Sequence, residues 1–123
     1  HPKLIRDRVN EMIRDEVIIG FTPFLDINKL DILYFKVHFK LKNYSQEKFT
    51  SLLQYALQHP NIIHTVEAVG GADYEIEVQV NNNEDLYKII EDIKIKFSEI
   101  IYDYEFMQYT KEYTLDYLPR QLI

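Results

Sequence analysis

The 123-residue chain contains no cysteine. This absence excludes disulfides, thiolate-bound zinc, iron–sulfur clusters and thiol nucleophiles, and it agrees with a reducing compartment, so we expect a cytoplasmic protein. Long apolar runs are also missing, because none approaches the roughly 20 residues that a membrane-spanning helix needs. We therefore expect no membrane partner.

The usual enzyme motifs are missing as well. No glycine-rich phosphate loop, paired-histidine metal motif or nucleophile elbow occurs in the sequence. His38, His59 and His64 stand apart, and two imidazoles without a carboxylate at fixed spacing seldom make a metal site. We expect no enzyme activity, no catalytic residue, no resident metal and no cofactor.

Basic residues are in the minority, and they are unevenly spread. The chain has 14 Lys and Arg against 20 Asp and Glu, a net charge of −6. Residues 1–66 hold nine basic and seven acidic side chains, whereas residues 67–116 hold four and thirteen. Most of the surface should therefore repel nucleic-acid phosphates, and any such contact must come from the N-terminal end or from residues outside this chain.

Glycine is scarce, so each of the three glycines should mark an unusual backbone geometry. Gly20 opens a weakly patterned stretch that runs to Lys29 and contains Pro23. We place a boundary there, between an N-terminal helix with its hinge (residues 1–29) and a main domain (residues 30–123).

The N-terminal segment Pro2–Glu16 has the apolar spacing of a helix. Its apolar stripe is formed by Ile5, Val9, Met12 and Ile13. The opposite face mixes Lys3, Arg6 and Arg8 with acidic residues, and such a face is ordinarily solvated and linked by salt bridges.

The rest of the chain predicts the order β-α-β-β-α-β. Alternating apolar residues and helix caps place these elements at 33–42, 46–58, 62–69, 74–80, a helix capped by Asn82 or Asn83, and about 101–109. In the last strand Tyr102, Tyr104 and Phe106 should face inward. This order is typical of the ferredoxin-like α+β fold, in which two helices cover one face of a four-stranded antiparallel sheet.

In that fold the 33–42 strand lies between the third and fourth strands. Its outward lysines would then face acidic side chains of both neighbours, which supports the strand order. The residues concerned are Lys36, Lys40, Lys42, Glu75, Glu77, Asp103 and Glu105.

No further segment is left to cover the outward face of the sheet. A partly apolar face with charges of both signs suits a second copy of the chain, so we expect a two-fold dimer with facing sheets. The expected interface residues are Tyr34, Lys36, His38, Met107 and Tyr109.

The turn Gly70–Asp73 is the strongest candidate for a ligand site. Adjacent glycines expose backbone N–H groups that suit a carboxylate, and Asp73 suits an ammonium group, so together they complement an α-amino acid. An ordinary hairpin turn has the same sequence features, and this interpretation stays open.

At these residues the chain resembles the ligand-sensing domain of the Lrp/AsnC family of transcriptional regulators. The resemblance lies in Val69-Gly70-Gly71-Ala72-Asp73-Tyr74 within its β-α-β-β-α-β setting, in His59-Pro60-Asn61-Ile62-Ile63, and in Asp26-Ile27-Asn28-Lys29-Leu30. The segments Arg8–Ile13 and Val17–Phe21 are similar to the end of that family's DNA-recognition helix and the following hinge.

The resemblance implies a homodimer that assembles into tetramers, octamers or larger rings, with an amino-acid or related effector bound between dimers near Val69–Tyr74. It also implies DNA contact by Lys3, Arg6 and Arg8 of a remnant helix, although the first helices of a complete helix-turn-helix are absent from this chain. One alternative is a stand-alone small-molecule-binding module that has lost DNA binding. An enzyme similar to siroheme decarboxylases is another, but arginine occurs only outside the predicted sheet and its helices, at positions 6, 8, 14 and 120.

Overall fold

The structure, a computed structural model, describes residues 2–116, 118 and 119. The elements, in chain order, are α1 (Pro2–Arg14), a 3-10 turn η1 (Ile27–Leu30), β1 (Leu33–Leu41), α2 (Gln46–Gln58), β2 (Ile62–Glu67), β3 (Tyr74–Val80), α3 (Asn83–Lys96) and β4 (Ile101–Tyr109). The predicted β-α-β-β-α-β order is confirmed, and so is the ferredoxin-like α+β fold.

The four strands form one antiparallel sheet in the order β2-β3-β1-β4. β1 therefore lies between β3 and β4, as the charge pattern predicts. Lys36 faces Glu77 of β3, and Lys40 faces Asp103 of β4. Opposite charges at facing positions stabilise this register by roughly 0.2–1 kcal/mol per exposed pair.

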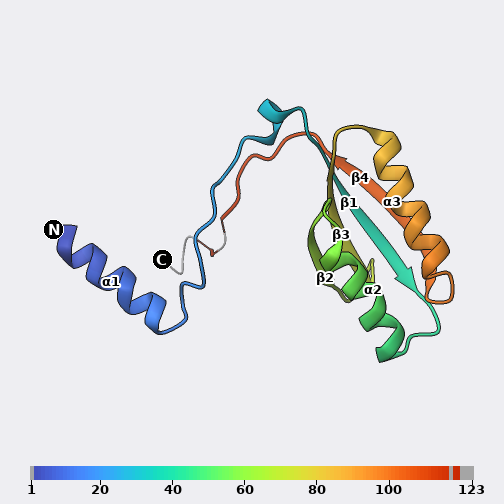
Figure 1. Cartoon of the computed structure of the whole chain (residues 1–123), viewed down its shortest axis with the longest axis horizontal. Coiled ribbons are helices and arrows are strands. Elements are labelled where there is room, and N and C mark those ends of the chain that lie inside the picture. Colours follow the sequence, from blue (N-terminus) through green and yellow to red (C-terminus); the bar gives the residue numbers. More distant parts are fainter. Residues whose placement is uncertain (1, 117, 120–123) are drawn as a thin grey trace.

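The core lies between one face of the sheet and the two helices α2 and α3, which cover the same side of it (Figure 1). Apolar and polar residues alternate along β1 and β3, so the apolar side chains of both strands point to the helix side of the sheet. The apolar stripes of α2 and α3 pack against them and complete the core. The fully buried members include Val37, Phe39, Leu52, Ile76, Val78, Leu86, Ile90 and Ile93.

The two helices that cover the sheet begin at side-chain caps. Ser45 Oγ accepts a hydrogen bond from the backbone N of Lys48 at 3.3 Å, and Asn82 Oδ1 accepts one from the backbone N of Asp85 at 2.9 Å. Each cap satisfies a backbone donor that has no partner inside the helix. The predicted caps are confirmed, with Asn82 rather than Asn83 in that position.

The start of β4 differs from the prediction because of a bulge. Leu41 pairs with Ile101 and Lys40 with Asp103, so Tyr102 is the extra residue. Ile101 is consequently buried, whereas Tyr102 is 70% exposed. The expectation that Tyr102 faces inward is wrong, because one inserted residue reverses the side to which the preceding positions point.

The N-terminal helix forms as predicted but has no buried residue. Figure 1 shows α1 apart from the sheet, beyond the extended segment that precedes η1. Its apolar stripe is therefore open, with Ile5 and Ile13 both exposed. Among the described residues, no helix is long and apolar enough to cross a membrane.

Candidate functional site

The connection between β2 and β3 carries the predicted ligand turn. β2 ends at Glu67, two residues earlier than predicted, and Val69 is fully exposed. Gly70 has φ of +125°, a conformation that L side chains rarely adopt, so the turn requires glycine there. Gly71 has no such requirement, and a Cβ added to it would meet no atom within 4 Å. Gly71 thus faces open space.

Asp73 forms hydrogen bonds that link this turn to the end of β1. Its Oδ2 accepts a hydrogen bond from the backbone N of Leu41 at 2.7 Å. Its own backbone N donates to Phe39 O at 3.0 Å, and its backbone O accepts from Ala68 N at 3.0 Å. One carboxylate oxygen of Asp73 is therefore engaged inside the fold, a structural role that the sequence pattern did not reveal.

Ala72 and Tyr74 face the core instead of the surface. Tyr74 is only 1% exposed; its ring stacks on Phe39 and meets the edge of Phe49. The Tyr74 hydroxyl accepts a hydrogen bond from the hydroxyl of Thr65. Within the turn, the surface open to a ligand is thus provided by Val69, by the two glycines, and by the exposed side chain of Asp73, one oxygen of which already accepts from Leu41.

A small cavity of about 50 Å³ lies where the turn meets the sheet. It has cationic and anionic side chains on its walls, which is the arrangement that a zwitterion needs. Its lining residues are His38, Lys40, Gly71, Asp103, Tyr104 and Glu105. The cavity is only partly enclosed, so one protomer would leave part of a bound amino acid uncovered.

Of these residues only Gly71 was predicted from the sequence to belong to the ligand site, and the residues missed are His38, Lys40, Asp103, Tyr104 and Glu105. The signal for them was present in the predicted strand order, because Lys40 and Asp103 occupy facing positions on β1 and β4. The sequence pattern could not predict that the turn at Gly71 lies close to Lys40 and Asp103. That proximity depends on how the connection between β2 and β3 folds back over the sheet.

The outward sheet face brings together the residues predicted for the dimer interface. Lys36 Nζ lies 3.2 Å from Glu75 Oε2 and 3.4 Å from Glu77 Oε1. The Tyr34 hydroxyl donates to Glu77, and the Tyr34 and Tyr109 rings are 4.6 Å apart. This network ties three strands together on the open side of the sheet.

Burial and hydrogen bonding act on two titratable groups of this network. Burial raises the pKa of the Tyr34 hydroxyl above its usual value, and its hydrogen bond to Glu77 raises it further. Burial alone would lower the pKa of Lys36, but the hydrogen bond to Glu75 and nearby acidic groups outweigh it and raise that pKa. Both groups therefore keep their protons at neutral pH.

Two histidines on this face lie beside carboxylates. His38 Nε2 is 3.6 Å from Glu75 Oε1, and its Nδ1 is 3.3 Å from Glu105 Oε1. His64 Nδ1 is 3.8 Å from Glu77 Oε2. In the part of the chain that the structure describes, no group of three or more His, Asp or Glu side chains could hold a metal ion.

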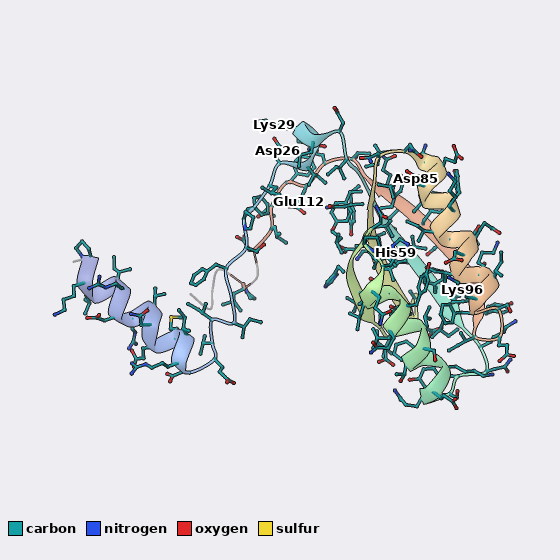
Figure 2. All side chains as sticks on the ribbon, in the orientation of Figure 1. Asp26, Lys29, His59, Asp85, Lys96 and Glu112 are labelled. Carbon is teal, nitrogen blue, oxygen red and sulfur yellow. The ribbon has the colours of Figure 1, made fainter. Side chains whose placement is uncertain are left out.

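The basic residues predicted for DNA contact lie on α1, away from the sheet, as Figure 2 shows for the whole helix. Lys3, Arg6 and Arg8 are all exposed. Arg8 forms an ion pair with Glu11 at 2.7 Å, one turn along. The mixed-charge interpretation of this face is thus confirmed for Arg8.

The chain is similar to known proteins in structure. No protein-family model matches the chain, and no curated protein matches it by sequence. Transcriptional regulator NMB0573 from Neisseria meningitidis, solved in complex with L-Met, is 12% identical with a TM-score of 0.83, over 100% of this chain and 80% of that chain.

Two further solved structures are also similar to this chain. AsnC of E. coli is 18% identical with a TM-score of 0.75, over 96% of this chain and 78% of that chain. TTHA0845 from Thermus thermophilus is 13% identical with a TM-score of 0.55, over 68% of this chain and 99% of that chain. At these identities the comparisons establish that the chain shares its ferredoxin-like fold with transcriptional regulators.

Proposed function

We propose that this chain is the effector-sensing and self-associating part of a transcriptional regulator of the Lrp/AsnC type, and that it has no catalytic role. The observation that carries the proposal is the extent of the structural likeness. The match to NMB0573 covers the whole chain at a TM-score of 0.83, so it includes α1 and the extended segment as well as the sandwich. A shared sandwich alone would leave these parts unmatched.

The proposed effector is an amino acid or a related small molecule, bound beside the Gly70–Asp73 turn. Lys40 would face its carboxylate, and Asp103 with Glu105 would face its ammonium group, since these side chains line the cavity next to Gly71. The cavity in one protomer is only partly enclosed, which supports a site completed by a second copy. The effector would then stabilise one assembly state over another.

The proposed assembly starts from a homodimer whose open sheet faces meet, and it continues to tetramers or octamers at the effector site. Tyr34, Met107 and Tyr109, which the β1–β4 register brings to the open face, would supply the apolar part of the dimer contact. DNA would be contacted at the other end of the chain, where Lys3, Arg6 and Arg8 of α1 are exposed. We keep the division between these two parts near residues 29 and 30, within η1, and place their action in the cytoplasm.

Calorimetric titration with each of the twenty L-amino acids tests the sensing proposal. Gly71→Leu adds bulk beside the cavity without backbone strain, and Gly20→Leu makes the same change in the extended segment, where a Cβ also meets nothing. We expect binding by the wild type and by Gly20→Leu, and a loss of at least about tenfold in Gly71→Leu. If no amino acid binds and none changes the assembly, the sensing proposal is wrong.

A stand-alone binding module without DNA contact is the second candidate. It is favoured by TTHA0845, whose whole chain matches two-thirds of this one. Fluorescence anisotropy with duplex DNA separates the two candidates. Binding that weakens with salt and is lost when Lys3, Arg6 and Arg8 are changed to Gln together supports the regulator, whereas absence of binding at low salt supports the module.

A further inference from the structure

The cavity beside the Gly71 turn has more carboxylates than lysines in its lining. Lys40 of β1 and Asp103 of β4 occupy facing positions, so the one lysine is already matched by one carboxylate. Glu105, two residues further along β4, adds a second carboxylate. One lysine against two carboxylates leaves a net charge of −1 when the histidine of the lining is not counted.

The His38 ring does not remove this excess. Its Nε2 lies 3.6 Å from Glu75 Oε1, and its Nδ1 lies 3.3 Å from Glu105 Oε1. Lys36 is 3.2 Å from Glu75, but it is also 3.4 Å from Glu77. The cavity lining and these neighbours together contain two lysines and four carboxylates. The surroundings are therefore negative whether the imidazole is neutral or charged.

Glu105 is the carboxylate of this group with the most room for a ligand. Its side chain is 74% exposed, whereas those of Glu75 and Glu77 are 22% and 14% exposed and contact Lys36. Glu75 and Glu77 are thus held within the fold by a lysine of the same chain. The open side of Glu105 is available to a bound molecule.

The spacing along β4 suits a ligand with a charged side chain. Asp103 and Glu105 point to the same face of the strand and lie about 6.6 Å apart along it. Lysine and arginine have long unbranched stems that separate their two cationic groups by a similar length. An α-ammonium beside Asp103 therefore leaves the side-chain cation near Glu105, while the α-carboxylate faces Lys40.

We propose that the site beside the Gly71 turn selects basic amino acids, and that Glu105 is the residue that determines this specificity. The inference rests on the effector site of the proposed function and names the class of effector. A neutral side chain at the same place would displace water from the Glu105 carboxylate without supplying a counter-charge. An acidic side chain would be repelled, and such repulsion selects against a wrong ligand.

Solvent limits the size of this preference. An ion pair that stays partly exposed is screened by water and salt, so the side-chain cation contributes a modest factor. We expect arginine to bind about three- to fivefold more tightly than citrulline, which has the same shape without the charge. The same ratio should separate lysine from norleucine, and high salt should reduce both ratios.

Calorimetric titration of the full chain with arginine and with citrulline measures the ratio of the two affinities. In Glu105→Gln this ratio should fall to about one. Glu99→Gln is the matched control, because the Glu99 side chain is 77% exposed and pairs with Lys48, between α3 and β4. It removes the same charge from the chain outside the cavity, so it should keep the wild-type ratio.

The outcomes separate this inference from the proposed function. Absence of binding by every amino acid contradicts the sensing proposal and this inference with it. Binding in which citrulline equals or exceeds arginine leaves the effector site in place and overturns its selectivity for basic amino acids. A preference for arginine that persists in Glu105→Gln, or that is lost equally in Glu99→Gln, overturns the assignment to Glu105.

Discussion

Replacing Asp73 by alanine should destabilise the fold itself, apart from any effect on a ligand. The Asp73 carboxylate accepts a hydrogen bond of 2.7 Å from the backbone N of Leu41, and this bond joins the β2–β3 turn to the end of the central strand. Hydrogen bonds to charged groups contribute about 1.5–3 kcal/mol. Because Asp73 is exposed, we expect a loss near the lower end, about 1–2 kcal/mol.

Urea unfolding followed by circular dichroism measures this loss of unfolding free energy. In a separate thermal melt, the melting temperature should fall by about 4–8 °C. Asp73→Asn keeps an acceptor and should lose less than half as much. Asp103→Ala removes another exposed carboxylate, one that accepts a hydrogen bond from the adjacent backbone N of Tyr104, and should change stability by less than about 0.5 kcal/mol. If Asp73→Ala is as stable as Asp103→Ala, the turn is not held by this hydrogen bond.

Three further predictions concern the turn, the helix layer and the core. Gly70→Ala should cost about 1–3 kcal/mol because of its φ of +125°, whereas Gly71→Ala should stay within about 0.5 kcal/mol, and equal losses in urea unfolding would contradict this contrast. Burial lowers the pKa of His59 below 6.5, so stability should decrease as the pH falls through 6.5, and thermal melts of His59→Gln should show a weaker decrease. Leu52→Ala empties a fully buried position and should cost about 2–5 kcal/mol in the same unfolding assay; a smaller loss would mean that the α2 contact is looser than described.

Much of the fold could be predicted because strong local patterns coincide with the final structure. The alternation in 33–41 and 74–80 produces the buried faces of β1 and β3 directly, and Ser45 and Asn82 cap the helices that follow. The bulge at Tyr102 was missed because alternation within one strand contains no information about an extra residue relative to its neighbour. That mismatch exists only once β1 and β4 pair.

The candidate site was predicted only in outline. The sequence located the glycine turn, because Gly70 and Gly71 are two of only three glycines in the chain. It did not reveal that Asp73 binds the backbone of Leu41, which lies 32 residues earlier in the chain. Contacts of this kind depend on the distance between a turn and the end of a strand, and no periodic pattern encodes such a distance.

The mass of the chain in solution tests the central claim most directly, which is that the open sheet face binds a second copy. Light scattering of the chain at neutral pH should give at least twice the protomer mass of 14.8 kDa. Met107→Arg, which places a long charged side chain on that face, should shift the mass toward 14.8 kDa. A mass of 14.8 kDa for the wild-type chain at every concentration, with and without amino acids, would contradict the account.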